Sequence, residues 1–159
     1  MSAPARTSVL FVCMGNICRS PLAEGAFLHK LNQRGVADRF TVDSAGTGHW
    51  HVGERPDRRA REIAQQHGIV LPSRARQVTR EDFQRFDHLI CMDETNREDL
   101  LDRGAPQEKL RLLLEANPAA EIHEVPDPYY GGADGFETVF RLIDAACDAL
   151  LDELLAAVR

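Results

Sequence analysis

A cysteine, an arginine and a serine near the start of the chain have the types and the spacing needed to attack a bound oxyanion. Cys13 ends an apolar run, and Arg19 and Ser20 follow after five intervening residues. A thiolate is a strong nucleophile, and the planar guanidinium fork can hold two oxygens of a phosphate group. The Ser20 hydroxyl can donate to the sulfur and improve it as a leaving group. The pattern predicts phosphate-ester chemistry, with Cys13 as the nucleophile and Arg19 as its catalytic partner.

The residues between Cys13 and Ser20 are suited to binding an anion through their backbone. We expect their N–H groups to point inward and form a nest, at the positive end of the helix that follows. Gly15 and Asn16 fit such a loop because they adopt backbone conformations that most residues avoid. The expected phosphate-binding residues are Met14, Gly15, Asn16, Ile17, Cys18, Arg19 and Ser20.

Other interpretations of these residues have less support in the sequence. A cysteine at the end of a buried strand is usually a small core residue, but the spacing to the arginine and serine favours catalysis here. A Walker-type phosphate loop is excluded because its lysine is missing. Cys91 and Cys147 are expected to be inert core residues. His49 and His51 have no acidic or cysteine partner at a ligand spacing, so we expect neither a metal site nor a cofactor.

Strands and helices alternate along the chain and would place the nucleophile at a strand end. Residues 8–12 show almost no polar alternation, which is typical of a parallel strand covered on both faces. Pro21 is favourable at a helix start, where its missing N–H is not needed. Further strands are expected at residues 40–42, 88–92 and 110–114, and helices at 57–66, at 94–102 and from about 134 onward.

This alternation predicts an α/β fold: a three-layer sandwich with a four-stranded parallel sheet and helices on both faces. At this length we expect one domain over residues 1–159, with 1–7 as a loose tail. The active crevice of such sheets lies beyond the carboxyl ends of the strands. Cys13 is at that edge, and three loops can reach it: the glycine-rich loop at 43–53, the loop after the strand at 88–92 and the loop at Asp127.

Composition narrows the setting in which this chemistry would occur. No apolar stretch approaches the ~20 residues needed to cross a bilayer, and the first residues lack the order of a signal peptide, so a cytoplasmic location is expected. Four cysteines without a C-x2-C pair indicate reduced thiols. The net charge of −6 argues against nucleic acid as a partner. However, residues 1–80 hold 12 Lys and Arg against 6 Asp and Glu, so an anionic substrate would be drawn to that half.

The sequence resembles the low molecular weight protein tyrosine phosphatases. The signature loop of that family, C-x-G-N-x-C-R-S-P, is matched by residues 13–21. The resemblance continues through DSAGT at 43–47, Trp50, ARQVT at 75–79, CMDE at 91–94 and DPYYG at 127–131, so it covers nearly the whole chain.

The resemblance implies roles that the residues alone do not. Asp127 matches the general acid, which protonates the tyrosyl oxygen and later activates water. Asn16 and Ser44 match a hydrogen-bond network that, with Ser20, supports the loop. Cys18 matches a thiol that forms a protective disulfide with Cys13 under oxidation. The aromatic walls of the substrate cleft are matched by Trp50, Tyr129 and Tyr130.

The resemblance also implies which partner the protein binds, and this sequence departs from the family at one position. The implied partner is a tyrosine-phosphorylated protein, without nucleic acid or membrane, and the expected state is a monomer or weak dimer. Ser73 stands where animal members commonly have a histidine near the signature loop, and no role is carried over to it.

Three alternatives remain open at this point. Protein arginine phosphatases share the fold but carry threonine at the position of Ile17. Arsenate reductases share the loop but use further cysteines in a disulfide relay, and Cys91 is too early in its strand for that. A phosphotyrosine-binding module without turnover would ordinarily lack one of Cys13, Arg19 and Asp127, and all three are present.

Overall fold

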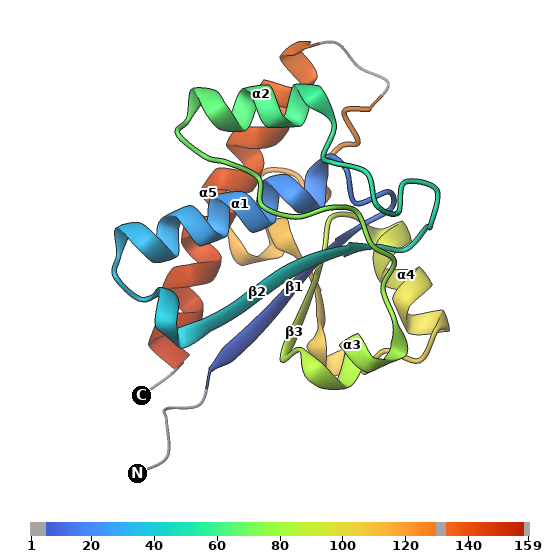
Figure 1. Ribbon diagram of the computed structural model, residues 1–159. Helices are drawn as coiled ribbons and strands as arrows, with labels where there is room; N and C mark the ends of the chain where they lie inside the picture. The colour runs from blue at the N-terminus through green and yellow to red at the C-terminus, as the bar shows by residue number, and fades with distance from the viewer. Residues whose placement is uncertain (1–5, 130–132, 158–159) are drawn as a thin grey trace.

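A four-stranded parallel sheet organises the protein, as the sequence predicts. The computed structural model describes residues 6–129 and 133–157. In chain order the strands are β1 (Thr7–Cys13), β2 (Phe40–Gly46), β3 (His88–Cys91) and β4 (Leu110–Leu112), and in the sheet their order is β2-β1-β3-β4. All three pairings are parallel, so all four carboxyl ends lie at one edge. β1 is central and carries Cys13 to that edge (Figure 1).

Helices cover both faces of the sheet, which confirms the expected three-layer α/β sandwich (Figure 1). On one face lie α1 (Arg19–Gln33), α2 (Arg58–Gln66) and α5 (Ala133–Ala157). On the other lie α3 (Arg80–Arg85) and α4 (Glu94–Asp102). Short 3-10 turns occupy Ala37–Arg39, Gln107–Lys109 and Leu113–Ala116.

The side chains of β1 alternate between two separate cores. Val9 and Phe11 pack with α1 and α5, whereas Leu10 and Val12 pack with α3 and α4, and all four are fully buried. Successive side chains of a strand point to opposite faces, so a strand covered on both sides needs an uninterrupted apolar run. The sequence of β1 has that run, and it makes the support of the nucleophile rigid.

Two strands differ from their expected bounds by two residues or more, and the other two by at most one residue at either end. β2 extends to Gly46 instead of ending at residue 42, because Asp43 and Ser44, which look like turn residues, pair with β1. Their side chains are satisfied elsewhere: Asp43 by Arg76 and Ser44 by Glu24. β4 is shorter than expected, because a 3-10 turn begins after Leu112.

The remaining boundaries agree closely with the pattern. β1 begins one residue earlier than expected, at Thr7, and α1 begins at Arg19, two residues before Pro21. Residues 1–5 of the expected tail and Tyr130 lie outside the described residues. In the part of the chain that the structure describes, no helix is both long and apolar enough to span a bilayer.

Candidate active site

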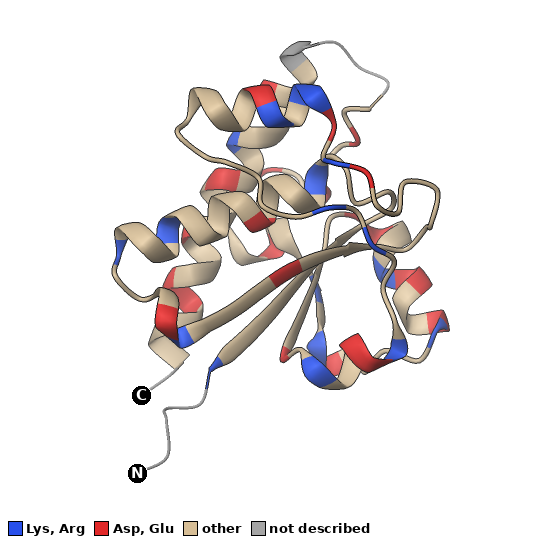
Figure 2. Ribbon diagram, viewed as in Figure 1, with Lys and Arg blue, Asp and Glu red and all other residues tan. Residues whose placement is uncertain are grey.

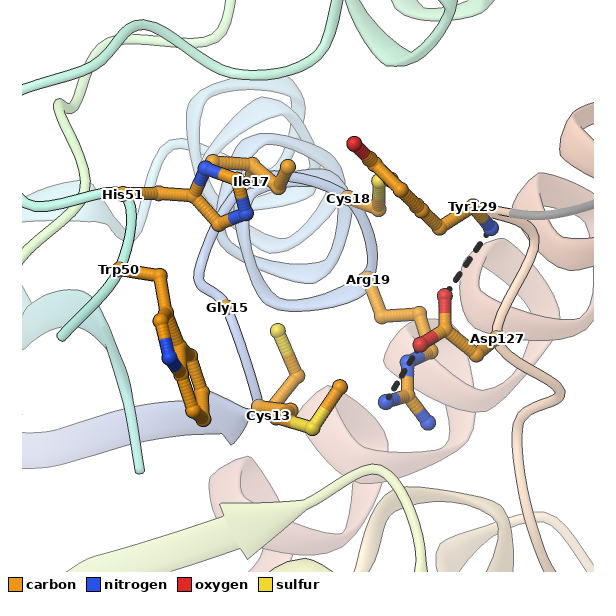
Figure 3. Close-up of a pocket in the computed structure, with 10 residues that line it drawn as sticks. Cys13, Gly15, Ile17, Cys18, Arg19, Trp50, His51, Asp127 and Tyr129 are labelled. Atoms are coloured by element: carbon orange, nitrogen blue, oxygen red, sulfur yellow. Dashed lines mark hydrogen bonds and ion pairs between the residues drawn. The ribbon is translucent and has the colours of Figure 1, made fainter. Parts of the chain in front are cut away.

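A cavity of about 360 Å³ opens at the carboxyl edge of the sheet, between β1 and α1 (Figure 3). The strand ends at Cys13 and the helix begins at Arg19, so the expected anion-binding loop spans residues 14–18. Segments far apart in the sequence complete the walls. The lining residues are Cys13, Met14, Gly15, Ile17, Cys18, Arg19, Trp50, His51, Asp127 and Tyr129.

The sulfur of Cys13 has two donors close to it. The Ser20 hydroxyl lies 2.9 Å from Sγ, and the backbone N–H of Asn16 donates to Sγ at 3.3 Å. Cys13 is almost completely buried, although it lines the cavity. Donors in such a site stabilise negative charge on sulfur, which is what a thiolate nucleophile requires.

Asn16 holds the loop in its shape through both ends of its side chain. Its φ of 56° is in the left-handed region, which asparagine tolerates better than most residues. The amide nitrogen donates to the Ser20 hydroxyl at 2.8 Å and to the Ser44 hydroxyl at 3.0 Å. The amide oxygen accepts from the backbone N–H of Arg76 at 3.0 Å. The structure thus brings together the three residues expected to support the loop.

The close approach of β2 to the loop depends on Gly46. A Cβ atom at this position would lie 2.7 Å from the carbonyl oxygen of Met14 and 3.2 Å from the backbone nitrogen of Asn16. Both neighbours are backbone atoms of the phosphate loop and cannot rotate away. Only glycine therefore allows the end of β2 to lie against this loop.

Glu24 is part of the loop support and was not predicted. Its Oε1 atom accepts from the Ser44 hydroxyl at 2.6 Å and from the Ser73 hydroxyl at 2.7 Å. Ser73, to which no role was carried over, therefore joins the network. Burial raises the pKa of the Glu24 carboxyl above its usual range. The available signal was an acid within an apolar helical stretch, with Leu22 and Ala26 on either side.

Arg19 is fixed by three groups from the other side of the site. Its Nη1 atom donates to Asp93 Oδ2 at 2.6 Å and to the Val125 carbonyl at 3.0 Å, and Nη2 lies 3.7 Å from Asp127 Oδ2. Burial opposes the charge, but the neighbouring Cys13 and the Asp93 carboxylate raise the pKa of the guanidinium. No role was predicted for Asp93. Its place directly after β3, at the same edge, was the signal.

Asp127 faces the cavity beside Arg19 and is held by its own loop. Its Oδ1 atom accepts from the backbone N–H of Tyr129 at 3.0 Å, and about a third of its side chain is exposed. Trp50 and Tyr129 stand on opposite sides of the cavity (Figure 3) and are 66% and 39% exposed. Two exposed aromatic side chains facing one cavity form a slot for a flat ring.

His51 also lines this cavity, a placement the sequence did not predict. Its ring points into the cavity (Figure 3), and Nδ1 lies 2.6 Å from Glu54 Oε2. Its position beside Trp50 in the glycine-rich loop was the signal. In residues 6–129 and 133–157 there is no group of three or more His, Cys, Asp or Glu able to hold a metal ion.

The other cysteines differ in their surroundings. Cys18 lines the same cavity as Cys13, and burial together with Asp57 raises the pKa of its thiol. It therefore remains protonated at neutral pH. Cys91 and Cys147 are fully buried in separate cores, and burial raises the pKa of both thiols. Their expected place in the core is confirmed.

Comparison with known proteins identifies where this geometry recurs. The family model described as low molecular weight phosphotyrosine protein phosphatase matches residues 8–159. The low molecular weight phosphotyrosine protein phosphatase of Sus scrofa is 40% identical, covering 97% of this chain and 99% of the relative. A crystal structure of a protein tyrosine phosphatase from Entamoeba histolytica superposes with a TM-score of 0.91 at 36% identity, covering 95% of this chain and 98% of the other. A Drosophila arginine phosphatase superposes with a TM-score of 0.86 at 34% identity, covering 92% and 96%.

Proposed function

The chain belongs to the low molecular weight phosphotyrosine protein phosphatase family, and we propose that it hydrolyses phosphotyrosine through a phosphocysteine formed on Cys13. The observation that supports this mechanism is the convergence of the loop that holds Cys13 and Arg19 with the distant residue Asp127 on one cavity. A nucleophile, an anion clamp and a proton source are the three groups that phosphate-ester cleavage needs. The substrates of the enzyme are phosphotyrosine proteins.

In the first step the Cys13 thiolate attacks phosphorus. A sulfur–phosphorus bond forms, the bond to the tyrosyl oxygen breaks, and its electron pair stays on that oxygen, which takes the proton of Asp127. The N–H groups of residues 14–19 and the Arg19 guanidinium bind the three other oxygens. Such preorganised donors stabilise charge that develops in the transition state.

In the second step water attacks the phosphocysteine. The Asp127 carboxylate takes a proton from the water, an oxygen–phosphorus bond forms, and the sulfur–phosphorus bond breaks with its electron pair returning to Cys13. The Ser20 hydroxyl, 2.9 Å from Sγ, donates to the departing thiolate. The same carboxyl group thus acts as acid and then as base, as microscopic reversibility requires.

The aromatic slot would select the substrate. Trp50 and Tyr129 would enclose the tyrosyl ring while its phosphate reaches the loop. Tyr130, outside the described residues, is proposed as a third wall on the basis of the family resemblance alone. The side chain of phosphoserine is much shorter than that of phosphotyrosine. It would not bring its phosphate to the loop while another part of the substrate occupies the aromatic slot.

The alternatives weighed from the sequence are not favoured. Ile17, not threonine, occupies the loop position that marks the arginine phosphatases. Cys91 is buried in the core that packs on α3 and α4, whereas a relay cysteine must reach the nucleophile. A binding module without turnover has no need of a proton donor such as Asp127.

We propose that Cys13 and Cys18 form a redox pair, because both residues line one cavity. A catalytic thiolate requires a reducing compartment, which supports a cytoplasmic location. We further propose that residues 1–159 form one phosphatase domain, acting as a monomer or weak dimer without a cofactor.

A chemical-quench experiment tests the mechanism. Labelled aryl phosphate is mixed with the enzyme, the reaction is stopped by denaturation at alkaline pH, where the sulfur–phosphorus bond is stable, and peptides are sequenced by mass spectrometry. Phosphate attached to the Cys13 sulfur is expected, and turnover without any phosphocysteine would contradict the mechanism. Parallel assays with phosphotyrosine, phosphoarginine and arsenate test the substrate class, and only the first should be processed at an appreciable rate.

A further inference from the structure

Arg59, in the first turn of α2, joins two loops of the active site that are distant in the sequence. Its guanidinium binds the Asp57 carboxylate through Nε at 3.1 Å and through Nη2 at 3.2 Å. The same Nη2 atom donates to the backbone carbonyl oxygen of Tyr129 at 3.0 Å. The proposed mechanism gives this side chain no role, although it contacts the loop that carries Asp127.

On the α2 side the guanidinium has a fixed base. Asp57 is the N-cap of α2 and accepts from the Arg59 backbone N–H at 2.8 Å. The backbone N–H of Asp57 donates to the Ile17 carbonyl of the phosphate loop at 2.8 Å. Burial opposes the charge of Asp57, but its bonds to Arg59 lower the pKa of the carboxyl, so the pair is ionised. Arg59 is therefore anchored, through one residue, to the phosphate loop.

On the other side the guanidinium holds the residue that orients the acid. The Tyr129 carbonyl accepts from Arg59, and the Tyr129 N–H donates to Asp127 Oδ1 at 3.0 Å. The Arg59 guanidinium carbon also lies 4.6 Å from the ring centroid of Phe136, in α5, and 5.7 Å from that of Tyr129. Two backbone groups of one residue thus connect Arg59 to the carboxyl group of Asp127.

We propose that Arg59 is a positioning residue for Asp127: it fixes Tyr129 relative to the phosphate loop, and so sets where the acid meets the leaving oxygen. This inference rests on the proposed role of Asp127 as proton donor. Without Arg59, the acid loop loses the hydrogen bond from this guanidinium to the Tyr129 carbonyl oxygen. A small displacement of a catalytic group lowers proton transfer strongly, because the transfer requires hydrogen-bond distance.

The neighbouring Arg58 provides a matched control. It has the same residue type and lies in the same turn, but its side chain is 77% exposed and its ion pair is with Glu62, at 3.7 Å on the same helix. The start of α2 and the loop before it carry both basic and acidic residues (Figure 2), and each of the two changes removes one positive charge from the first turn of the helix. A difference between the two variants then reports the position and contacts of Arg59 beyond the loss of one charge.

The test compares Arg59→Met with Arg58→Met on two esters. Methionine retains an apolar stem against the Phe136 ring but cannot donate. The value of kcat/KM, which covers the steps up to release of the phenol, is measured with phosphotyrosine and with a dinitrophenyl phosphate, whose leaving group needs little protonation. For Arg59→Met we expect a loss of about 10- to 100-fold on phosphotyrosine and less than about 3-fold on the activated ester. For Arg58→Met we expect changes within about 2-fold on both.

Asp127→Asn is the reference variant. Its kinetics separate the proposed acid role of Asp127 from the proposed positioning role of Arg59. If Asp127→Asn shows the leaving-group dependence and Arg59→Met lowers both esters equally, the positioning role is overturned while the acid role stands. If Asp127→Asn itself lowers both esters equally, the acid role is overturned and the inference with it. The double variant should lose no more on phosphotyrosine than Asp127→Asn alone, and additive losses would contradict the coupling.

Arg59→Lys provides the same test if the methionine variant does not fold. Lysine keeps a positive charge beside Asp57 but lacks the fork that reaches Asp57 and Tyr129 together. A smaller loss with the same dependence on the leaving group is expected. A loss that is equal on both esters would reject the inference.

Discussion

The Nη2 atom of Arg19 lies 3.7 Å from the Oδ2 atom of Asp127. The group proposed to hold phosphate is thus the direct neighbour of the group proposed to deliver the proton. A phosphate bound in the fork of Arg19 would have its ester oxygen turned outward, toward the aromatic slot and within reach of Asp127. Arg19 and Asp127 would therefore act on different faces of one phosphate group. Arg19 would bind the phosphate oxygens, and Asp127 would protonate the ester oxygen.

Asp127→Asn should affect substrates according to their leaving groups. The phenol of tyrosine has a pKa near 10 and leaves poorly without a proton, so kcat/KM with phosphotyrosine should fall by about 10²- to 10³-fold. With a dinitrophenyl phosphate the loss should be only a few fold. Steady-state assays on both esters provide the measurement, and equal losses would remove Asp127 from the acid role.

Cys13→Ser should abolish turnover while phosphate still binds. The serine hydroxyl is a far weaker nucleophile at neutral pH, so activity should fall by at least about 10⁴-fold. Titration calorimetry with inorganic phosphate should still detect binding, because the N–H groups and Arg19 remain. Cys91→Ala is the control, since that thiol is buried in a separate core and should leave turnover intact. Substantial hydrolysis by Cys13→Ser would reject the phosphocysteine.

Hydrogen peroxide should inactivate the enzyme reversibly through a disulfide between Cys13 and Cys18. The thiolate oxidises first to a sulfenic acid, which the neighbouring thiol then condenses with, releasing water. Mass spectrometry should find the linked peptides, and dithiothreitol should restore activity. In Cys18→Ser the same treatment should lead to sulfinic and sulfonic acid at Cys13, with no recovery. An intact wild-type enzyme that shows only these irreversible products would contradict the protective role.

Gly46→Ala should distort the phosphate loop without unfolding the sheet. The added Cβ would lie 2.7 Å from the Met14 carbonyl, and a shift of the loop by about 1 Å can cost about 10²-fold in rate. Gly135→Ala is a matched control in α5, where the added Cβ would make only an ordinary contact at 3.9 Å. Kinetics and thermal unfolding of both variants test the prediction. Full activity in Gly46→Ala would show that the loop tolerates the extra atom.

The buried Glu24 should make stability depend on pH. Its carboxyl has a raised pKa in the folded protein, so the folded state keeps a proton that the unfolded state releases. The contribution of Glu24 to the stability of the wild type therefore decreases as pH rises from the unfolded pKa, near 4.3, through the folded one. Glu24→Gln stays neutral, and its amide oxygen can still accept from Ser44 and Ser73.

Urea unfolding from pH 4 to pH 8 provides the measurement for Glu24. The free energy of unfolding of Glu24→Gln should increase relative to that of the wild type as pH rises, so the variant becomes comparatively more stable. Gln66, at the exposed end of α2, offers a position where Gln66→Glu should show no comparable trend. A difference between Glu24→Gln and wild type that is constant over this range would contradict the prediction.

The parts of the fold that local sequence determines were predictable. The apolar run of β1, the loop from Cys13 to Ser20 and the start of α1 are contiguous, and each residue type favours its own position. The same holds for the fold class, because alternating strands and helices allow few topologies. The residues expected to support the loop, Asn16 and Ser44, were found through the resemblance and meet as it implies.

The missed features depend on contacts between segments far apart in the sequence. Glu24 and Asp93 look like ordinary helix and loop acids until the fold places them against Ser44 and Arg19. No role was predicted for Arg59, because its contact with Tyr129 spans 70 positions. The end of β2 was predicted too early because Asp43 and Ser44 resemble turn residues. Only their pairing with β1 shows that they belong to the strand.

The fully covered central strand has a consequence for how such an enzyme can diversify. Val9, Leu10, Phe11 and Val12 are fully buried, so a change in any of them affects one of the two cores and the strand that ends at Cys13. Trp50 and Tyr129, by contrast, extend from exposed loops whose replacement leaves both cores intact. Selection can therefore alter which phosphoproteins are accepted by changing the rim, while the sequence that makes the chemistry possible is constrained by the demands of folding.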